Sequence, residues 1–184
     1  ALFAEGGMDS IIQDARQKSV TLLGLGVNVN LAPVADVSTD PNDFIYDRSF
    51  GQDAQATAEY VSNVVKTMDA EGIGSVLKHF PGYGNNVDTH TGVAIDERPY
   101  ETFQTSDYLP FTAGIQAGAD AVLVSHNVMS CVDNQLPASL SPAVHNELRS
   151  TLGFQGVIMT DDLAMDAVAA YAGDQSPAVM AVKA

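Results

Sequence analysis

The sequence contains a single cysteine, few basic residues and no long apolar run. Cys131 has no second cysteine with which to form an internal disulfide, and one thiolate does not make a cysteine metal site. Eight lysines and arginines stand against 23 aspartates and glutamates, which gives a formal net charge of −15. Because such a surface repels phosphate backbones, we predict no nucleic-acid partner. The apolar runs are far shorter than a bilayer is thick, so we also predict no membrane span.

The remaining composition is that of a globular protein. The chain has 184 residues, of which 46% are hydrophobic and 17% are charged, and it has no low-complexity tract. This length is enough to bury a sizeable core. We therefore predict one domain over residues 1–184.

Short apolar segments alternate with helical patterns along the chain. The apolar segments lack strict polar alternation, as expected for parallel strands that are covered on both faces. Helical patterns between them repeat apolar residues every three or four positions. This alternation predicts a parallel α/β architecture. The predicted strands are 27–34, 74–80, 119–126 and 156–162, and the predicted helices are 8–24, 53–71, 109–117, 142–151 and 176–184.

Polar residues that can take part in chemistry gather directly after the predicted strands. In a (β/α)8 barrel the active site is built at the carboxyl ends of the strands. A doubly wound open sheet is the alternative, but no Gly-x-Gly-x-x-Gly follows a strand. We therefore predict an incomplete (β/α)8 TIM barrel with about four strand–helix units. Such a chain is either a portion of a longer one or a half-barrel that pairs with a second copy. The polar residues are Asp36, Arg48, His126, Asn127, Asp161 and Asp162, together with the loop after residue 80.

The stretch LKHFPGYGNNVDTHTG, residues 77–92, is dense in groups that carry or transfer a proton. Asp88, two residues before His90, can fix the tautomer of the imidazole and raise its basicity. The alternative is a capping aspartate beside an exposed histidine. Lys78 and His79 end an apolar strand, where a buried charge is costly unless it faces a polar cavity. The alternative for Lys78 is a side chain that extends past the strand end into solvent.

Two adjacent carboxylates, Asp161 and Asp162, end the fourth predicted strand. Neighbouring side chains of a strand point to opposite sides, so only one of them faces the barrel mouth. That carboxylate could act as a nucleophile, or the pair could cap the following helix. A metal-dependent barrel hydrolase is a rival reading, but no H-x-H occurs on a strand and Lys78 repels a cation. We predict no metal and no cofactor. The rival metal ligands are His79, Asp88, His90, His126 and Asp161.

Six motifs together resemble those of glycoside hydrolase family 3, in its bacterial β-N-acetylhexosaminidase branch. They occur in the order and spacing of that family, from about residue 15 to the end of the chain. The KHFPGYG element followed by DTH is the most specific of them. The motifs are NLAPVADV at 30–37, DRSFG at 47–51, KHFPGYG at 78–84, DTH at 88–90, PASLSP at 137–142 and GFQGVIMTDDLAM at 153–165.

The resemblance implies a (β/α)8 barrel that hydrolyses terminal β-linked N-acetylglucosamine with retention of configuration. Peptidoglycan fragments, as in peptidoglycan recycling, or chitooligosaccharides are the implied carbohydrate substrates. Asp161 matches the nucleophile, and His90 with its partner Asp88 matches an acid/base dyad in place of a second carboxylate. Asp162 is left to helix capping. The residues that match sugar-binding positions are Arg48, Lys78 and His79.

The sequence departs from the family pattern at two places. Tyr83 stands where many relatives carry histidine, which we expect to have little effect on the chemistry. The upstream acidic segment of the D-x-E-G-G type has no counterpart, because residues 5–7 follow Ala4 and precede a helical pattern. We therefore expect the chain to be inactive alone and its parent to be active. A phosphorylase, or a non-catalytic half-barrel that forms a homodimer if it is stable, are the alternatives. The compartment, bacterial cytoplasm or cell envelope, stays unassigned.

Overall fold

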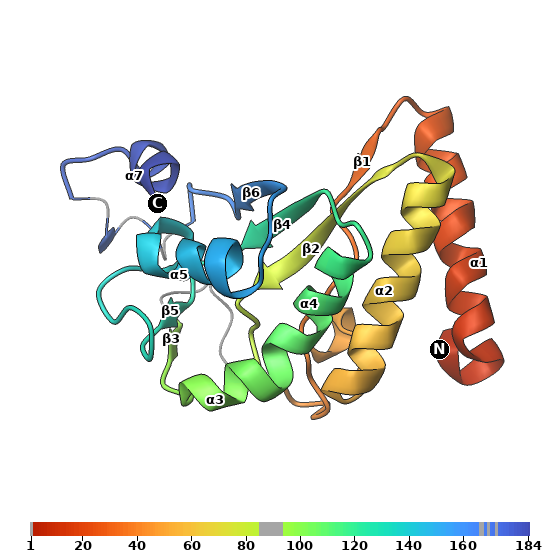
Figure 1. Ribbon diagram of the computed structural model, residues 1–184, viewed down its shortest axis with the longest axis horizontal. Helices are drawn as coiled ribbons and strands as arrows, with labels where there is room; N and C mark the ends of the chain where they lie inside the picture. Colours follow the sequence, from red (N-terminus) through yellow and green to blue (C-terminus); the bar gives the residue numbers. More distant parts are fainter. Residues whose placement is uncertain (1, 85–93, 166–167, 169, 172) are drawn as a thin grey trace.

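The computed structural model describes residues 2–84, 94–165, 168, 170–171 and 173–184 (Figure 1). In the described part of the chain, short parallel strands alternate with helices, as the sequence predicts. The helices and helical turns are α1 (Leu2–Gly24), η1 (Tyr46–Arg48), α2 (Ala54–Glu71), α3 (Tyr100–Thr102), η2 (Phe103–Asp107), α4 (Tyr108–Gln116), η3 (Ala138–Leu140), α5 (Pro142–Asn146), η4 (Glu147–Thr151) and α7 (Pro177–Lys183). The strands are β1 (Val29–Asn30), β2 (Gly74–Phe80), β3 (Ile95–Asp96), β4 (Ala121–Val124), β5 (Val128–Met129) and β6 (Val157–Thr160).

The main sheet has four parallel strands in the order β1-β2-β4-β6. Their spatial order equals their order along the chain, as in successive units of a (β/α)8 barrel. Leu123 of β4 pairs with Lys78 of β2 on one side and with Met159 of β6 on the other. The register fixes which residues reach the carboxyl edge together, and β2 shifts register directly after Lys78.

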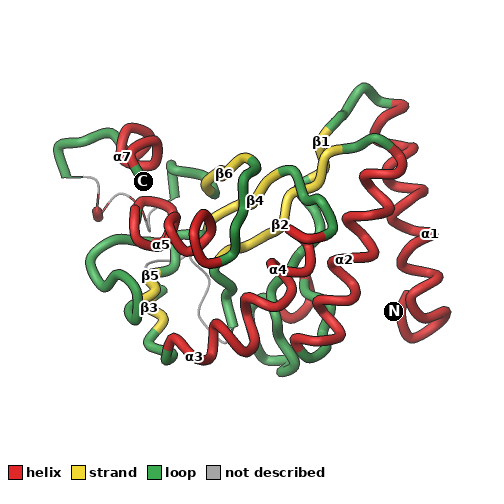
Figure 2. Tube along the Cα trace, in the orientation of Figure 1, coloured by secondary structure: helices red, strands yellow, loops and turns green. Residues whose placement is uncertain are grey.

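Helices α1, α2 and α4 lie side by side along one side of the sheet (Figure 2). Helix α2 begins where the carboxylate of Asp53 accepts a hydrogen bond from the backbone N–H of Ala56, at 2.8 Å. Apolar residues at helical spacing then point at the strands and are buried. The main core lies between these two layers. It includes Val61 and Val65 of α2, Leu77 of β2, Phe111 of α4 and Val122 of β4.

The opposite face of the sheet carries a second, smaller apolar layer. It consists of Val76, Ala121 and Leu123, with the partly buried Met159 packed against them. Side chains alternate between the faces of a strand. Lys78 follows Val76 by two positions and Asp161 follows Met159 by two positions, so this face leads to both polar groups at the carboxyl edge.

The structure differs from the sequence-based prediction at the first strand. Regular pairing covers only Val29–Asn30, whereas the prediction was 27–34. The chain nevertheless continues beside β2, because the carbonyl oxygen of Ala32 accepts from Val76 N at 2.9 Å and Val34 bridges Lys78. The apolar run therefore predicts an extended segment correctly but overstates its regular length.

A second small sheet was not predicted. Strand β3 pairs in parallel with β5, which joins Ile95 to Val128 and Asp96 to Met129. A continuous helical run, α3, η2 and α4, follows β3, so the predicted helix 109–117 is the last part of a longer element. In Figure 1 the β3–β5 pair lies apart from the main sheet, below α5.

Both outer edges of the main sheet lack a neighbouring strand among the described residues, since β1 pairs only with β2 and β6 only with β4. Apolar side chains at these edges are exposed: Val29 and Leu31 near β1, and Val157 of β6, which is 63% exposed. None of the helices within the described ranges is long and apolar enough to cross a membrane.

Candidate active site

Lys78, Arg48, Asp36 and Asp161 converge at the carboxyl edge of the main sheet. Lys78 is half-buried near the end of β2, and burial lowers the pKa of its ammonium group. The guanidinium of Arg48 lowers this pKa further. The carboxylates of Asp161 and Asp36 act in the opposite direction. Asp161, the predicted nucleophile, therefore lies in one electrostatic cluster with Lys78 and Arg48, the two predicted sugar-binding cations.

Asp36 organises the turn that follows β2. The residue is 1% exposed, and its Oδ2 accepts from the backbone N–H of His79 at 3.0 Å. The other oxygen, Oδ1, accepts from the backbone N–H of Tyr83 at 2.8 Å. Oδ2 also lies 2.8 Å from Nδ1 of His79. One buried carboxylate therefore fixes both the backbone of the turn and the ring of His79.

The hydrogen bonds of His79 define its tautomer. Nδ1 faces the carboxylate of Asp36, which can only accept, so Nδ1 carries the proton. Nε2 lies 3.2 Å from Nη2 of Arg48, and a guanidinium can only donate. Nε2 is therefore the acceptor. The result is a chain from a buried carboxylate through a buried imidazole to the exposed Arg48.

Asp161 and Asp162 have different surroundings, as the alternation of a strand predicts. The backbone N–H of Asp161 donates to the carbonyl oxygen of Val124 at 3.0 Å, which holds it at the end of β6. Oδ1 of Asp162 accepts from the N–H of Ala164 at 2.9 Å, a local contact of the kind that starts a turn or helix. The exposed Asp162 thus makes a local turn contact, and Asp161, whose Oδ1 accepts from the backbone N–H of Asp162 at 2.9 Å, belongs to the cluster with Lys78.

His126 is a structural neighbour of the cluster. It is fully buried at the end of β4, and its Nε2 lies 2.9 Å from the carbonyl oxygen of Asp162. Because a carbonyl only accepts, Nε2 carries the proton, and in a neutral ring Nδ1 accepts from the hydroxyl of Ser139 at 2.7 Å. His126 therefore supports the backbone next to Asp161.

The predicted dyad, Asp88 and His90, lies outside the described residues. The structure thus brings together Arg48, Lys78, His79 and Asp161 of the predicted site residues. Within the described ranges, no group of three or more His, Cys, Asp or Glu side chains gathers in a way that could hold a metal ion.

Sequence reasoning missed the part that Asp36 takes in the site, and it missed the cluster of Asp96, Arg98 and Asp107. Asp36 was noticed as a polar residue after a strand, which is the signal that could have added it to the site. Arg98 binds the carboxylates of Asp96 and Asp107 and also contacts the carbonyl oxygen of Gly82. The spacing of Asp96 and Arg98 gives a weak local signal, and Asp107 in a helical turn gives none.

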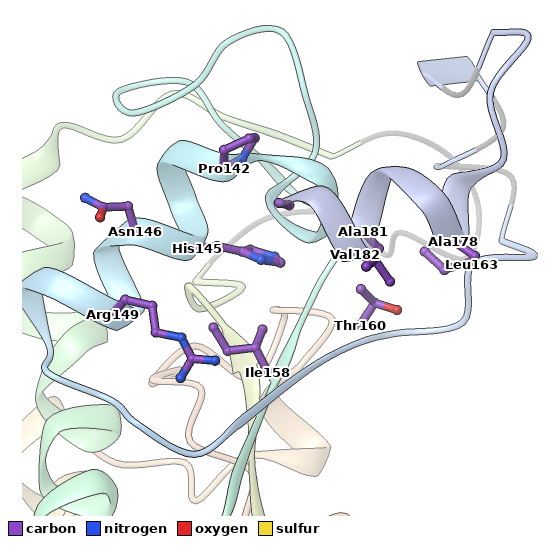
Figure 3. Close-up of a pocket in the computed structure, with 11 residues that line it drawn as sticks. Pro142, His145, Asn146, Arg149, Ile158, Thr160, Leu163, Ala178, Ala181 and Val182 are labelled. Atoms are coloured by element: carbon purple, nitrogen blue, oxygen red, sulfur yellow. The ribbon is translucent and has the colours of Figure 1, made fainter.

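A cavity of about 610 Å³ lies away from this cluster (Figure 3). His145 points into it from α5, and Val182 of α7 stands on the other side. Strand β6 contributes Ile158 and Thr160, which alternate with Met159 and Asp161. The cavity therefore belongs to the helix-facing side of β6, and we do not assign the chemistry to it.

Comparisons with known proteins agree with this geometry. The sequence model of the family described as glycosyl hydrolase family 3 N terminal domain matches residues 1–184. A beta-hexosaminidase of Xylella fastidiosa (strain M12) is 40% identical over 149 residues, which are 80% of this chain and 44% of that protein. A beta-hexosaminidase of Xanthomonas campestris pv. campestris (strain B100) is 38% identical over 171 residues, or 91% of this chain and 51% of that protein.

Solved structures are similar over nearly the whole chain. A glycoside hydrolase family 3 beta-N-acetylglucosaminidase from Paenibacillus sp. str. FPU-7 gives a TM-score of 0.92 at 32% identity. The match covers 99% of this chain and 35% of that one. It confirms the predicted fold class, an incomplete barrel with four strand–helix units. The chain spans about half the length of the curated relatives that it matches.

Proposed function

Because the chain belongs to glycosyl hydrolase family 3, we propose that the whole protein is a retaining glycoside hydrolase that removes terminal β-linked N-acetylglucosamine. Residues 1–184 form part of its catalytic barrel and act as one domain. The names of the relatives, beta-hexosaminidase and beta-N-acetylglucosaminidase, support this substrate class. Peptidoglycan fragments or chitooligosaccharides are the sources of such a sugar.

The electrostatic cluster of Asp161 with Lys78 and Arg48 is the observation that carries the proposal. Retention needs an anionic nucleophile beneath the anomeric carbon. Asp161 supplies the anion at the carboxyl edge of the sheet, where barrel enzymes hold their substrates. It attacks the anomeric carbon as the glycosidic bond breaks, and a covalent glycosyl ester forms on its carboxylate.

His90 donates the proton to the departing oxygen, with Asp88 as its partner. In the second half of the reaction, His90 takes a proton from a water molecule that attacks the anomeric carbon and releases Asp161. His90 donates as imidazolium and becomes neutral imidazole, so it adds no second negative charge near the nucleophile. The family motif supports these two assignments, since both residues lie outside the described ranges.

Lys78, Arg48 and His79 bind the hydroxyl groups of the sugar. Lys78 and Arg48 are donors at the same edge of the sheet as Asp161. His79 is 3% exposed and its Nε2 accepts from Arg48. When Arg48 turns toward a sugar hydroxyl, the same Nε2 becomes available as an acceptor for a neighbouring hydroxyl. Lys78 and Arg48 can donate hydrogen bonds and Nε2 of His79 can accept one, and sugar hydroxyl groups can do both.

The experiment compares Asp161→Asn with Asp162→Asn in the full-length protein, on an aryl β-N-acetylglucosaminide. We expect Asp161→Asn to lose at least roughly 10³-fold in kcat, since it removes the nucleophile. Asp162→Asn is the matched control, because an asparagine oxygen can still accept from the backbone N–H of Ala164. Similar activity in the two variants would remove Asp161 from the mechanism.

Phosphate separates hydrolysis from phosphorolysis. A neutral histidine as acid/base leaves room for an anionic acceptor such as phosphate, so phosphorolysis is the variant closest to the proposed reaction. Turnover that needs phosphate and yields a sugar 1-phosphate would replace hydrolysis with phosphorolysis. Turnover that is independent of phosphate and yields free N-acetylglucosamine supports the hydrolase.

A second candidate function is a non-catalytic half-barrel that forms a homodimer. The exposed apolar side chains at both open edges of the sheet, Val29 and Val157 among them, favour it. The mass of residues 1–184 in solution tests this candidate. A well-folded monomer argues against pairing, whereas a dimer that binds sugar without turnover supports it.

A further inference from the structure

The imidazole ring of His79 is held on three sides. Nδ1 lies 2.8 Å from Oδ2 of Asp36, and the same oxygen accepts from the backbone N–H of His79 at 3.0 Å. The ring of Tyr83 packs against the imidazole, with the two centroids 5.3 Å apart and the planes at 78°. Nε2 faces Nη2 of Arg48 at 3.2 Å. The orientation of the ring is therefore set by a buried carboxylate, a buried aromatic ring and an exposed cation.

These contacts also keep the proton of the ring on Nδ1. If the proton moved to Nε2, a lone pair of Nδ1 would face the carboxylate of Asp36 and an N–H would face the guanidinium of Arg48. Both new contacts would join groups of the same kind, at a site where an unpaired polar atom is costly because it is buried. Nε2 of His79 is thus fixed as a hydrogen-bond acceptor.

A fixed acceptor beside a cation suits one kind of chemical group. A sugar hydroxyl has one proton and two lone pairs, so it can donate to Nε2 of His79 while it accepts from Arg48. An ether oxygen or a fluorine atom has no proton to donate and would leave Nε2 unpaired. Arg48 is exposed and can turn aside for a sugar, whereas His79 is buried and stays in place. The acceptor, more than the cation, therefore decides which substituent fits.

We propose that Asp36 is a positioning residue that makes the site selective for a free sugar hydroxyl. Asp36 acts through His79, because it keeps Nε2 as an acceptor and so excludes a sugar that carries an ether at the same position. This inference rests on the proposed function, in which His79 contacts the sugar. The competing explanation is that Asp36 only stabilises the turn after β2. The two explanations differ in how an Asp36 variant treats a sugar that lacks the hydroxyl proton.

The first measurement is the tautomer of His79 in the full-length wild-type protein. Nitrogen-15 NMR of histidine-labelled protein distinguishes a protonated ring nitrogen from an unprotonated one. The variant His79→Asn identifies the signal of His79, because the signal is lost in it. We expect a proton on Nδ1 and none on Nε2 at neutral pH. A proton on Nε2, in a neutral ring or in an imidazolium, overturns the inference.

The second measurement is a selection ratio. It is kcat/KM on an aryl β-N-acetylglucosaminide divided by kcat/KM on its 3-, 4- or 6-deoxyfluoro analogue. Fluorine cannot donate a hydrogen bond, and its electron withdrawal slows the reaction in every variant alike. A difference in this ratio between two variants therefore reports on the hydrogen bond that the hydroxyl donates.

His79→Asn shows which hydroxyl donates to His79. The asparagine Nδ2 takes the place of Nδ1 and keeps the contact with Asp36, but nothing replaces Nε2. At one of the three positions we expect this variant to lower the wild-type ratio by roughly 10- to 100-fold, since an unpaired buried acceptor costs on this order. An unchanged ratio at all three positions overturns the inference.

Asp36→Ala should lower the ratio at the same position to near the value of His79→Asn. The matched control is Asp120→Ala, which should keep the wild-type ratio. Asp120 also accepts from a backbone N–H of β2, that of Ser75 at 2.8 Å, but at the amino end of the sheet. A wild-type ratio in Asp36→Ala overturns the inference, because the carboxylate would then act on stability alone.

A further variant covers the case in which Asp36→Ala does not fold. The amide of His79→Gln reaches the place of Nε2 without a contact to Asp36, so either its oxygen or its NH2 group can face the sugar. We expect a ratio below that of wild type, and a wild-type ratio overturns the inference. Asp161→Asn reports on the proposed function itself. If this variant loses turnover while Asp36→Ala keeps the wild-type ratio, only the inference fails, and if it stays active, both fail.

Discussion

The imidazole Nδ1 of His79 lies 2.8 Å from the carboxylate Oδ2 of Asp36, and both side chains are buried at the carboxyl edge of the sheet. The same carboxylate accepts from the backbone N–H groups of His79 and Tyr83. Asp36 thus accepts from three donors, the backbone N–H groups of His79 and Tyr83 and the ring Nδ1–H of His79. It also orients the ring that meets Arg48, so both the stability of the turn and the proposed sugar contacts depend on this carboxylate.

Removal of the Asp36 carboxylate should therefore damage both properties. Asp36→Ala removes the acceptor of these three buried hydrogen bonds, and we expect a loss of about 3–5 kcal/mol in the free energy of unfolding. Urea unfolding of the full-length protein measures this loss. Asp120→Ala is the control, because that exposed carboxylate also accepts from a backbone N–H, that of Ser75, but at the amino end of the sheet. Equal losses in the two variants would contradict the special weight given to Asp36.

Gly114 tests the packing of α4 on the sheet. A Cβ atom there would lie 2.7 Å from Leu77 and 2.9 Å from Val61, both in the main core. We expect Gly114→Ala to lower the free energy of unfolding by about 1–2 kcal/mol, because overpacking exceeds the gain in helix propensity. Gly24→Ala, at the end of α1 with open space around it, should be neutral or slightly stabilising. Urea unfolding compares the two, and a stabilised Gly114→Ala would show that the core adapts easily.

The main sheet could be predicted from the sequence because several independent local signals agree on its strands and helices. Strand β2 has the predicted bounds, since an apolar run is enclosed by Gly72 and Pro81, and α2 carries its own cap at Asp53. Strands β3 and β5 have two residues each and no alternation from which to recognise them. Their pairing depends on contacts between distant segments, which a local pattern does not encode.

The proximity of several candidate site residues could be predicted from polar residue types that follow strand ends. Lys78, Arg48 and Asp161 were expected at one edge, and the structure brings them together. The contact of Asp36 with His79 was not predicted. A carboxylate after a strand can cap a helix or contact a ligand, and the sequence alone does not show which donors it meets. Asp107 gave no signal at all, since aspartate in a helical turn ordinarily faces water.

Asp107 gives the folded protein a specific pH dependence. Burial raises the pKa of Asp107 to about 6, even though Arg98 opposes the shift, whereas the ordinary value is 3.8. The stabilisation from protonated Asp107 is complete below pH 3.8 and is lost as the pH rises through about 6. From pH 5 to 7.5 we expect wild type to lose about 1–2 kcal/mol relative to Asp107→Asn.

Urea unfolding at several pH values measures this difference directly. The variant itself is the reference, because asparagine has the same shape and does not titrate. A constant difference between wild type and Asp107→Asn over this range would mean that Asp107 stays ionised, and that the ion pair with Arg98 outweighs its burial.

The charged side chain of Lys78 is expected to lower the free energy of unfolding. Burial lowers the pKa of Lys78, and the nearby charge of Arg48 adds to this, so the folded state disfavours the charged form. Lys78→Met should therefore raise the free energy of unfolding at pH 7, by less than about 1 kcal/mol because the side chain is only half-buried. The gain should shrink as the pH rises toward 10.5, where Lys78 loses its proton in both states.

The same variant should lose activity on the aryl substrate, since it removes a proposed donor to the sugar. Lys66→Met, on the exposed side of α2, is the control and should change neither quantity. A destabilised Lys78→Met protein would contradict the expected cost of burying this charge. Full activity would contradict a role of Lys78 in sugar binding.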